Sequence, residues 1–135
     1  MTGNAPRHLA VWLDHRTARL LTLSRQGVAE QVIHNPDSGV SGHVHHHAGT
    51  TGSGHAAMDK DFLENISHAI GEAEEILILG PVEARSALKT FLDHHDQHQA
   101  KRIVGVEAVD HSGVAEIADF AQRFFNRVGR MGLPN

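Results

Sequence analysis

The sequence predicts an α/β domain built on one mixed β-sheet, and three observations support this class. Three short segments of strand character follow one another with only brief polar connections: 9–13 and 28–33 alternate, and 20–23 is an apolar run. Two continuous apolar runs, 76–79 and 103–106, have the length of strands buried on both faces. Segments with helical periodicity precede and follow each of these runs. Antiparallel strands are therefore expected first, and helices then alternate with buried strands.

The first three strands form an antiparallel meander in this prediction, because their connections are as short as hairpin turns. Residues 14–17 make a polar turn after the first strand, and residues 25–27 make the next turn. Asp14 is expected to bond its own backbone in the first of these turns. The third strand ends at the Asn-Pro-Asp-Ser-Gly segment 35–39.

The helices are placed by their end signals. Asp59 suits the N-cap of the first helix, and Gly71 ends that helix or nearly so. Pro81 fits the first turn of the second helix, and residues 93–98 look like its frayed end. Ser112 is the expected cap of the last helix. The residues of this last helix that are expected to point inward are Val114, Ile117, Ala118, Ala121, Phe125 and Val128.

The resulting order is three strands, a long loop, and then helix, strand, helix, strand and helix. This is the element order of the ribonuclease H-like fold, a mixed five-stranded sheet with helices on both faces. A flavodoxin-like doubly wound sheet would need helices between the first strands, where the turns leave no room. The whole chain, residues 1–135, matches one average domain in length, and a second domain is not expected.

Composition excludes several kinds of chemistry and of partner. No apolar run approaches the roughly 18 residues of a membrane span, and the first eight residues lack the apolar stretch of a signal peptide. We therefore expect a cytoplasmic location and no membrane partner. The absence of cysteine removes disulfides, thiolate nucleophiles and cysteine zinc sites. The formal charge of −4 argues against generic, charge-driven binding to nucleic acid, and leaves only local basic patches for that role.

The most distinctive segment is a loop rich in histidine and glycine, residues 35–58. Connections within compact domains are usually about 4–6 residues long, so a loop of this length is either functional or disordered. Its histidines are dense enough to accept zinc or another divalent transition metal, although no cofactor is required. Because they stand among glycines, a solvated low-complexity loop is the simpler interpretation. The candidate metal ligands are His43, His45, His47 and His55.

Two other groups of residues could carry chemistry but also have simpler structural interpretations. Asp14, Glu64 and Asp119 could supply carboxylates for two-metal nuclease chemistry. Leu-Gly-Pro at 79–81 stands where the fourth strand would need an acid, which argues against a nuclease. Gly-Pro-Val at 80–82 could bind an anion at a helix N-terminus, but a tight strand-to-helix turn is the better interpretation.

Near the C-terminus, Arg123, Arg127 and Arg130 share one face of the last predicted helix at spacings of i, i+4 and i+7. Such a stripe could contact RNA phosphates, because arginine pairs readily with phosphate oxygens. A solvated helix surface is the more ordinary meaning of the same pattern.

Three stretches carry a family resemblance: Val-Trp-Leu-Asp-His-Arg-Thr-Ala-Arg at 11–19, Ile-Leu-Ile-Leu-Gly-Pro at 76–81 and Val-Gly-Val-Glu-Ala-Val-Asp-His at 104–111. They resemble the small bacterial proteins labelled translational machinery proteins, and the resemblance extends over about residues 8–127. Those proteins are in turn similar to the central domain of the archaeal and eukaryotic class I peptide release factors and of Pelota. The resemblance implies a ribonuclease H-like domain with a role in translation.

The resemblance also implies where the functional element lies. In the release factors, the segment between the third strand and the first helix carries a Gly-Gly-Gln tripeptide that positions water to hydrolyse peptidyl-tRNA. Here the loop 35–58 occupies that place, and it contains Gly-Ser-Gly-His at 52–55 but no Gly-Gly-Gln. Flanking codon-reading and partner-binding domains are also absent from the sequence. Pelota-like members show that such a domain can persist without the tripeptide.

The leading hypothesis is a translation-associated domain that binds the ribosome, ribosomal RNA or transfer RNA without catalysing a reaction. The first alternative is a hydrolase of peptidyl-tRNA or another ester, with His45 or His55 as general base. The second is a metal-binding module that uses the loop histidines, and a homo-oligomer also remains open. The expected contacts with RNA or the ribosome are His43, His45, His46, His47, Arg123, Arg127 and Arg130.

Overall fold

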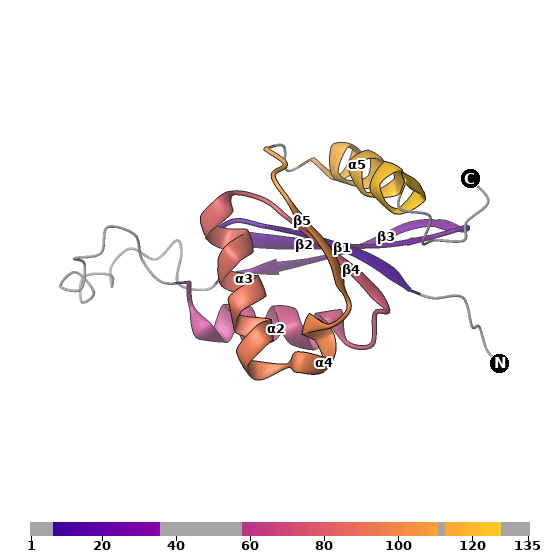
Figure 1. Ribbon diagram of the computed structural model, residues 1–135. Coiled ribbons are helices and arrows are strands. Elements are labelled where there is room, and N and C mark those ends of the chain that lie inside the picture. The colour runs from indigo at the N-terminus through magenta and orange to yellow at the C-terminus, as the bar shows by residue number, and fades with distance from the viewer. Residues whose placement is uncertain (1–6, 36–57, 111–112, 128–135) are drawn as a thin grey trace.

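The computed structural model describes residues 7–35, 58–110 and 113–127, which form one five-stranded sheet with helices on both faces (Figure 1). The strands are β1 (His8–Leu13), β2 (Thr17–Ser24), β3 (Gly27–His34), β4 (Glu75–Leu79) and β5 (Ile103–Glu107). The helices are α2 (Lys60–Ile70), α3 (Val82–His95), α4 (Gln97–Ala100) and α5 (Val114–Arg127). None of these described helices is long and apolar enough to cross a membrane.

The sheet is mixed, with strand order β3-β2-β1-β4-β5. β2 runs antiparallel to both of its neighbours, whereas β1, β4 and β5 are parallel. The strands β1, β3, β4 and β5 therefore all end on one side of the sheet, which we call the carboxyl edge; the opposite side is the amino edge. α3 follows the end of β4 and α5 follows the end of β5, so both helices start near the carboxyl edge (Figure 1). This order and topology are those of the ribonuclease H-like fold, and the predicted fold class is confirmed.

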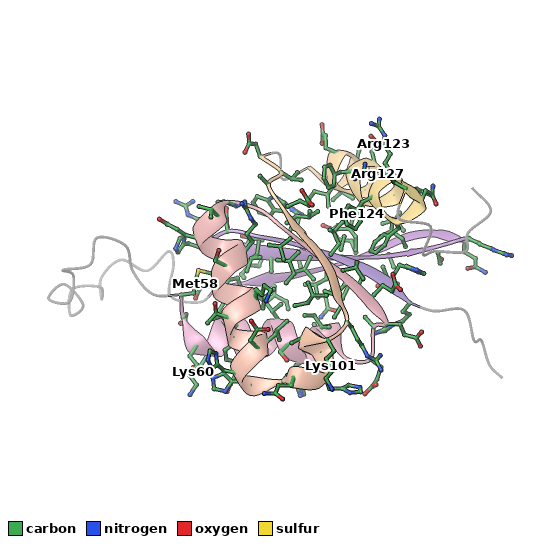
Figure 2. All side chains as sticks on the ribbon, viewed as in Figure 1. Met58, Lys60, Lys101, Arg123, Phe124 and Arg127 are labelled. Atoms are coloured by element: carbon green, nitrogen blue, oxygen red, sulfur yellow. The ribbon has the colours of Figure 1, made fainter. Side chains whose placement is uncertain are left out.

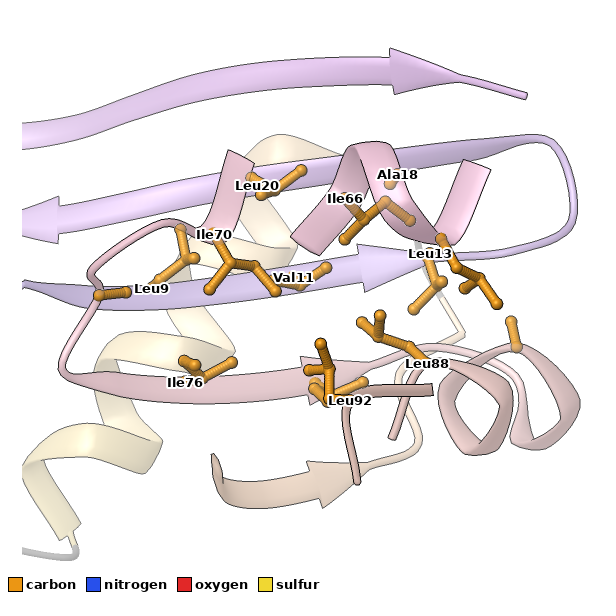
Figure 3. Packing of buried hydrophobic residues seen from close by; sticks show 14 of the residues in the cluster. Leu9, Val11, Leu13, Ala18, Leu20, Ile66, Ile70, Ile76, Leu88 and Leu92 are labelled. Carbon is orange, nitrogen blue, oxygen red and sulfur yellow. The ribbon is translucent and has the colours of Figure 1, made fainter. Parts of the chain in front are cut away.

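The core consists of two apolar layers, one on each face of the sheet. β1 alternates between them, because successive side chains of a strand point to opposite faces. Leu9, Val11 and Leu13 pack under α2 and α3, as Figure 3 shows. Ala10 and Trp12 instead pack under α5. The four apolar residues at the end of β4 are fully buried, which confirms the prediction of a strand covered on both faces.

Three local predictions were wrong. The strand β5 is only half-buried along its length, because it lies at the end of the strand order and no described strand pairs with its outer side. Residues 93–98 are not a frayed end: α3 continues to His95, and Asp96 then accepts a hydrogen bond from the backbone N–H of Gln99 and caps α4. Pro81 is the N-cap of α3 and not a residue of its first turn. The predicted cap Ser112 and the predicted inward residue Val128 lie outside the described residues.

Candidate functional site

The site begins at the turn between β1 and β2, which Asp14 holds at the carboxyl edge. Its Oδ1 accepts hydrogen bonds from the backbone N–H groups of Arg16, at 2.8 Å, and Thr17, at 2.9 Å. This confirms Asp14 as a turn residue. The side-chain amide of Asn35 donates to the carbonyl of His15 at 3.0 Å, and its backbone N–H donates to the carbonyl of Arg16 at 2.9 Å. The chain is therefore fixed to this turn at the residue that precedes segment 36–57.

The residues that follow segment 36–57 are fixed as well. Asp59 is the N-cap of α2, as predicted, and its Oδ1 accepts hydrogen bonds from the N–H groups of Asp61, at 2.8 Å, and Phe62, at 3.4 Å. Met58 packs against the apolar layer under α2 and α3. In Figure 2, Met58 lies on the same side of the molecule as the start of α3, which is the carboxyl edge. Both flanks of segment 36–57 are thus attached to the scaffold at this edge.

The turn between β4 and α3 completes the edge. Gly80 has φ of +131°, and a Cβ at this position would overlap the carbonyl oxygen of Leu13 at the end of β1. Its N–H donates to the carbonyl of Glu107 at 3.2 Å, and its own carbonyl accepts from Nη1 of Arg85 at 2.7 Å. Gly80 therefore joins the ends of three parallel strands. The predicted tight strand-to-helix turn is confirmed.

The charged side chains beside the two flanks of segment 36–57 include two exposed cations. Arg16 is in the turn held by Asp14, and Lys60 is the first residue of α2. The first N–H groups of α2 are not free for a ligand, because the carboxylate of Asp59 already accepts hydrogen bonds from those of Asp61 and Phe62. The two exposed side chains match the chemistry of phosphate recognition, which uses arginine and lysine.

The carboxylates considered for nuclease chemistry do not form a metal site. Among the described residues, no group of three or more histidine, aspartate or glutamate side chains is arranged to hold a metal ion. The carboxylate of Asp14 accepts a hydrogen bond within its own turn, and that of Asp119 forms an ion pair with Arg123. Glu64 lines a pocket between α2, α3 and α4.

Two of the three predicted arginines lie elsewhere on the molecule. Nη2 of Arg123 is 2.9 Å from Oδ2 of Asp119, and both side chains are largely exposed. The guanidinium carbon of Arg127 lies 5.5 Å from the ring centroid of Phe124. Both arginines are in the second half of α5, on the side of the molecule away from Met58 (Figure 2). The third, Arg130, lies outside the described residues.

The loop histidines are not among the residues that the structure describes. Their predicted roles in catalysis, RNA binding and metal binding therefore stay predictions, and the structure shows only how the flanking residues are held. The predicted residues concerned are His43, His45, His46, His47 and His55.

The sequence reasoning missed a pocket of about 560 Å³ that opens between α2, α3 and α4. Gln99 is buried beside it, and its Nε2 donates to the carbonyls of Ser67 and Gly71, each at 3.0 Å. The ring of His95 stacks on Phe91 with centroids 4.5 Å apart. The signal in the sequence was the polar run 93–98, which was interpreted as a frayed end. The remaining lining residues are Glu64, His68, Glu72, Asp96 and His98.

No family model and no curated protein sequence matches the chain. Solved structures do match it. Pelota from Archaeoglobus fulgidus has a TM-score of 0.63 and 16% identity, over 89% of this chain and 32% of that chain. Pelota from Thermoplasma acidophilum has a TM-score of 0.58 and 16% identity, over 87% of this chain and 32% of that chain. A further archaeal protein has a TM-score of 0.54 and 13% identity, over 93% of this chain and 38% of that chain.

The chain thus spans between 32% and 38% of the length of these proteins. At such low identity the likeness shows the fold alone, and it agrees with the element order and sheet topology described above. The chain is a distant structural relative of one part of Pelota, with the same ribonuclease H-like architecture.

Proposed function

We propose that this chain is a translation-associated domain that binds ribosomal or transfer RNA, without catalysing a reaction, through the carboxyl edge and segment 36–57. One observation carries the proposal. Asn35 and Asp59, which flank the segment, are each hydrogen-bonded into the scaffold at the carboxyl edge of a fold shared with Pelota. In the release factors, which the sequence also resembles, the corresponding segment is the functional element.

The exposed cations at the same edge support this assignment. Arg16 and Lys60 flank the two ends of the segment, so an RNA backbone that meets the segment would also meet these two side chains. The chain as a whole is acidic, with a formal charge of −4, so its attraction to RNA has to be local. The contact residues we propose within the segment are His43, His45, His46 and His47.

Cosedimentation with purified ribosomes tests the proposal. Replacing His43, His45, His46 and His47 together by alanine is expected to weaken binding by about tenfold or more, since four contacts are lost at once. The matched control replaces four exposed histidines of the α2–α4 region by alanine, and it is expected to leave binding unchanged. These control residues are His68, His94, His95 and His98.

Deletion of residues 39–57 is expected to abolish cosedimentation while the circular dichroism spectrum of the folded scaffold is retained. Binding should persist after the protein alone has been treated with a chelator and dialysed before ribosomes are added, because the proposed contacts do not need a bound transition metal. The proposal fails if the intact chain does not cosediment at low salt, or if both histidine sets reduce binding equally.

A further inference from the structure

The strand β3 is the most exposed element of the sheet. It is at the end of the strand order, and within the described residues no strand pairs with its outer side. Val28 is 43% exposed and Val32 is 37% exposed, and both project from the same face as Glu30. Within the described residues, β3 contains no lysine or proline and keeps an unbroken register with β2 from end to end, so few of the usual protections of an edge strand are present.

The hydrogen-bonding pattern tells which backbone groups of β3 point outward. In an antiparallel pair, successive residues alternate between facing the neighbouring strand and facing away from it. The N–H of Asn35 donates to the carbonyl of Arg16, so the odd-numbered residues of this strand face β2. The even-numbered residues therefore direct their N–H and C=O groups away from the sheet. These residues are Val28, Glu30, Val32 and His34.

The outer side of β3 is complementary to itself in one register. Glu30 forms an ion pair with Arg19 of its own chain, with Nη1 and Oε2 2.7 Å apart. When two copies run antiparallel with Val32 on the twofold axis, this carboxylate of each copy also lies opposite His34 of the other. Centring the pair on Glu30 would place two like charges opposite each other, and centring it on Gln31 would place Glu30 opposite Val32. The register centred on Val32 alone joins an apolar centre to two acid–imidazole pairs. It also lets the outward residues of the two strands exchange about six backbone hydrogen bonds.

We propose that the chain forms a twofold dimer in which β3 pairs antiparallel with β3 of a second copy, with Val32 on the axis. The two five-stranded sheets then form one continuous sheet. α5 lies on the same face in both copies, and α2 and α3 lie on the other. The partner is a second copy of this chain, because Glu30, Val32 and His34 of one strand match His34, Val32 and Glu30 of an antiparallel copy.

Sedimentation equilibrium with two valine variants tests the interface. Val32→Lys places two ammonium groups next to the axis, and we expect the dimer dissociation constant to rise by about tenfold or more. Val82→Lys is the matched control, because Val82 is also an exposed valine, at 59%, but lies at the start of α3. It is expected to leave the dissociation constant unchanged.

The register is tested by disulfide formation, since the chain has no cysteine of its own. Val32→Cys should form a disulfide-linked dimer under mild oxidation, because residues directly opposite in a hydrogen-bonded pair have Cα atoms about 5.5 Å apart. Val28→Cys should not, because in this register the two thiols lie roughly 25 Å apart along the strands.

Four results would overturn the proposal. The first is a chain that remains monomeric at every concentration up to about 1 mM, where even a weak dimer is populated. The second is a dimer that Val32→Lys and Val82→Lys affect equally. The third is a chain that binds an extended peptide of another protein along β3 but does not pair with a second copy of itself. A dimer that is linked through Val28→Cys as readily as through Val32→Cys would contradict the register and with it the proposed interface.

Discussion

The two edges of the sheet are held together in different ways. At the carboxyl edge, short side chains and a glycine fix most of the backbone: Asp14 and Asp59 cap their own turns, and Gly80 packs against the end of β1. The longer side chain of Arg85 also donates there to the carbonyl of Gly80. At the amino edge, long side chains reach from one element to another. Gln99 bonds the carbonyls at the end of α2, and Arg102 donates to the carbonyl of Ala73 at 3.3 Å.

This difference indicates which edge is available for a partner. At the amino edge the buried amide of Gln99 is already engaged by the protein itself, so a ligand there would have to compete for it. At the carboxyl edge the backbone is fixed mainly by small groups and by Arg85, and the cationic side chains of Arg16 and Lys60 remain exposed. A rigid backbone with exposed cations suits a surface that binds phosphate.

The largest effect on stability is expected from Gly80→Ala. The added Cβ would overlap the carbonyl oxygen of Leu13, and φ of +131° is strained for any side chain, so we expect a loss of about 3 kcal/mol or more. Gly27→Ala separates the two causes, because Gly27 has nearly the same φ, +132°, but nothing within 4 Å of its Cβ position. It should cost only about 1–2 kcal/mol. Equal losses in urea unfolding would show that the contact with Leu13 is unimportant.

A smaller loss of stability is expected when a buried, hydrogen-bonded side chain at the amino edge is removed. Gln99→Ala removes three hydrogen bonds of a side chain that is only 4% exposed, which should cost about 2–3 kcal/mol. Gln97→Ala changes an exposed glutamine of the same short helix, and it should change the free energy of unfolding by less than about 0.5 kcal/mol. Ribosome binding should survive Gln99→Ala under conditions where the variant is folded. Loss of binding in the folded variant would place the contact surface at the amino edge.

The smallest effect on stability is expected from Asp59→Ala. Loss of the N-cap of α2 should cost about 1 kcal/mol, and it also loosens one flank of segment 36–57. Asp61→Ala is the control, because Asp61 is an exposed acid of the same helix turn that does not cap it. If the flank matters for function, Asp59→Ala weakens ribosome binding and Asp61→Ala does not. Chemical unfolding and cosedimentation on the same preparations check both statements.

Local features of the fold were predictable from the sequence, because their causes lie within a few residues. Asp14 and Asp59 cap the turns that follow them, and Gly71 ends α2 as predicted. The exposure of β5 was not predictable, because an apolar run does not reveal which strand lies at the end of the sheet. Phe124 was missed for a similar reason. It fits over Gly105 of β5, where a Cβ would lie 2.5 Å from its ζ carbon, and helical periodicity does not show this contact.

The candidate site was predictable only as a position in the chain. The place of segment 35–58 between the third strand and the first helix follows from element order, and its attachment at both flanks agrees with that position. Arg123 and Arg127 lie away from this edge because of how α5 packs on the sheet. This packing cannot be read from the local sequence pattern. Of the two cations beside the segment, Lys60 already follows it closely in the sequence. Arg16 becomes its neighbour only in the folded chain, where Asn35 is bonded to the turn that contains Arg16.

The affinity of two double variants for purified ribosomes tests most directly whether the carboxyl edge is the contact surface. Arg16→Ala with Lys60→Ala removes the cations of this edge, and Arg123→Ala with Arg127→Ala removes the arginines of α5. We expect the first pair to weaken binding by about tenfold. It should also reduce the slope of log affinity against log salt by the equivalent of up to about two phosphate contacts. The second pair should change the affinity by at most about twofold. The opposite ranking, with α5 dominant and the carboxyl edge neutral, would contradict the account.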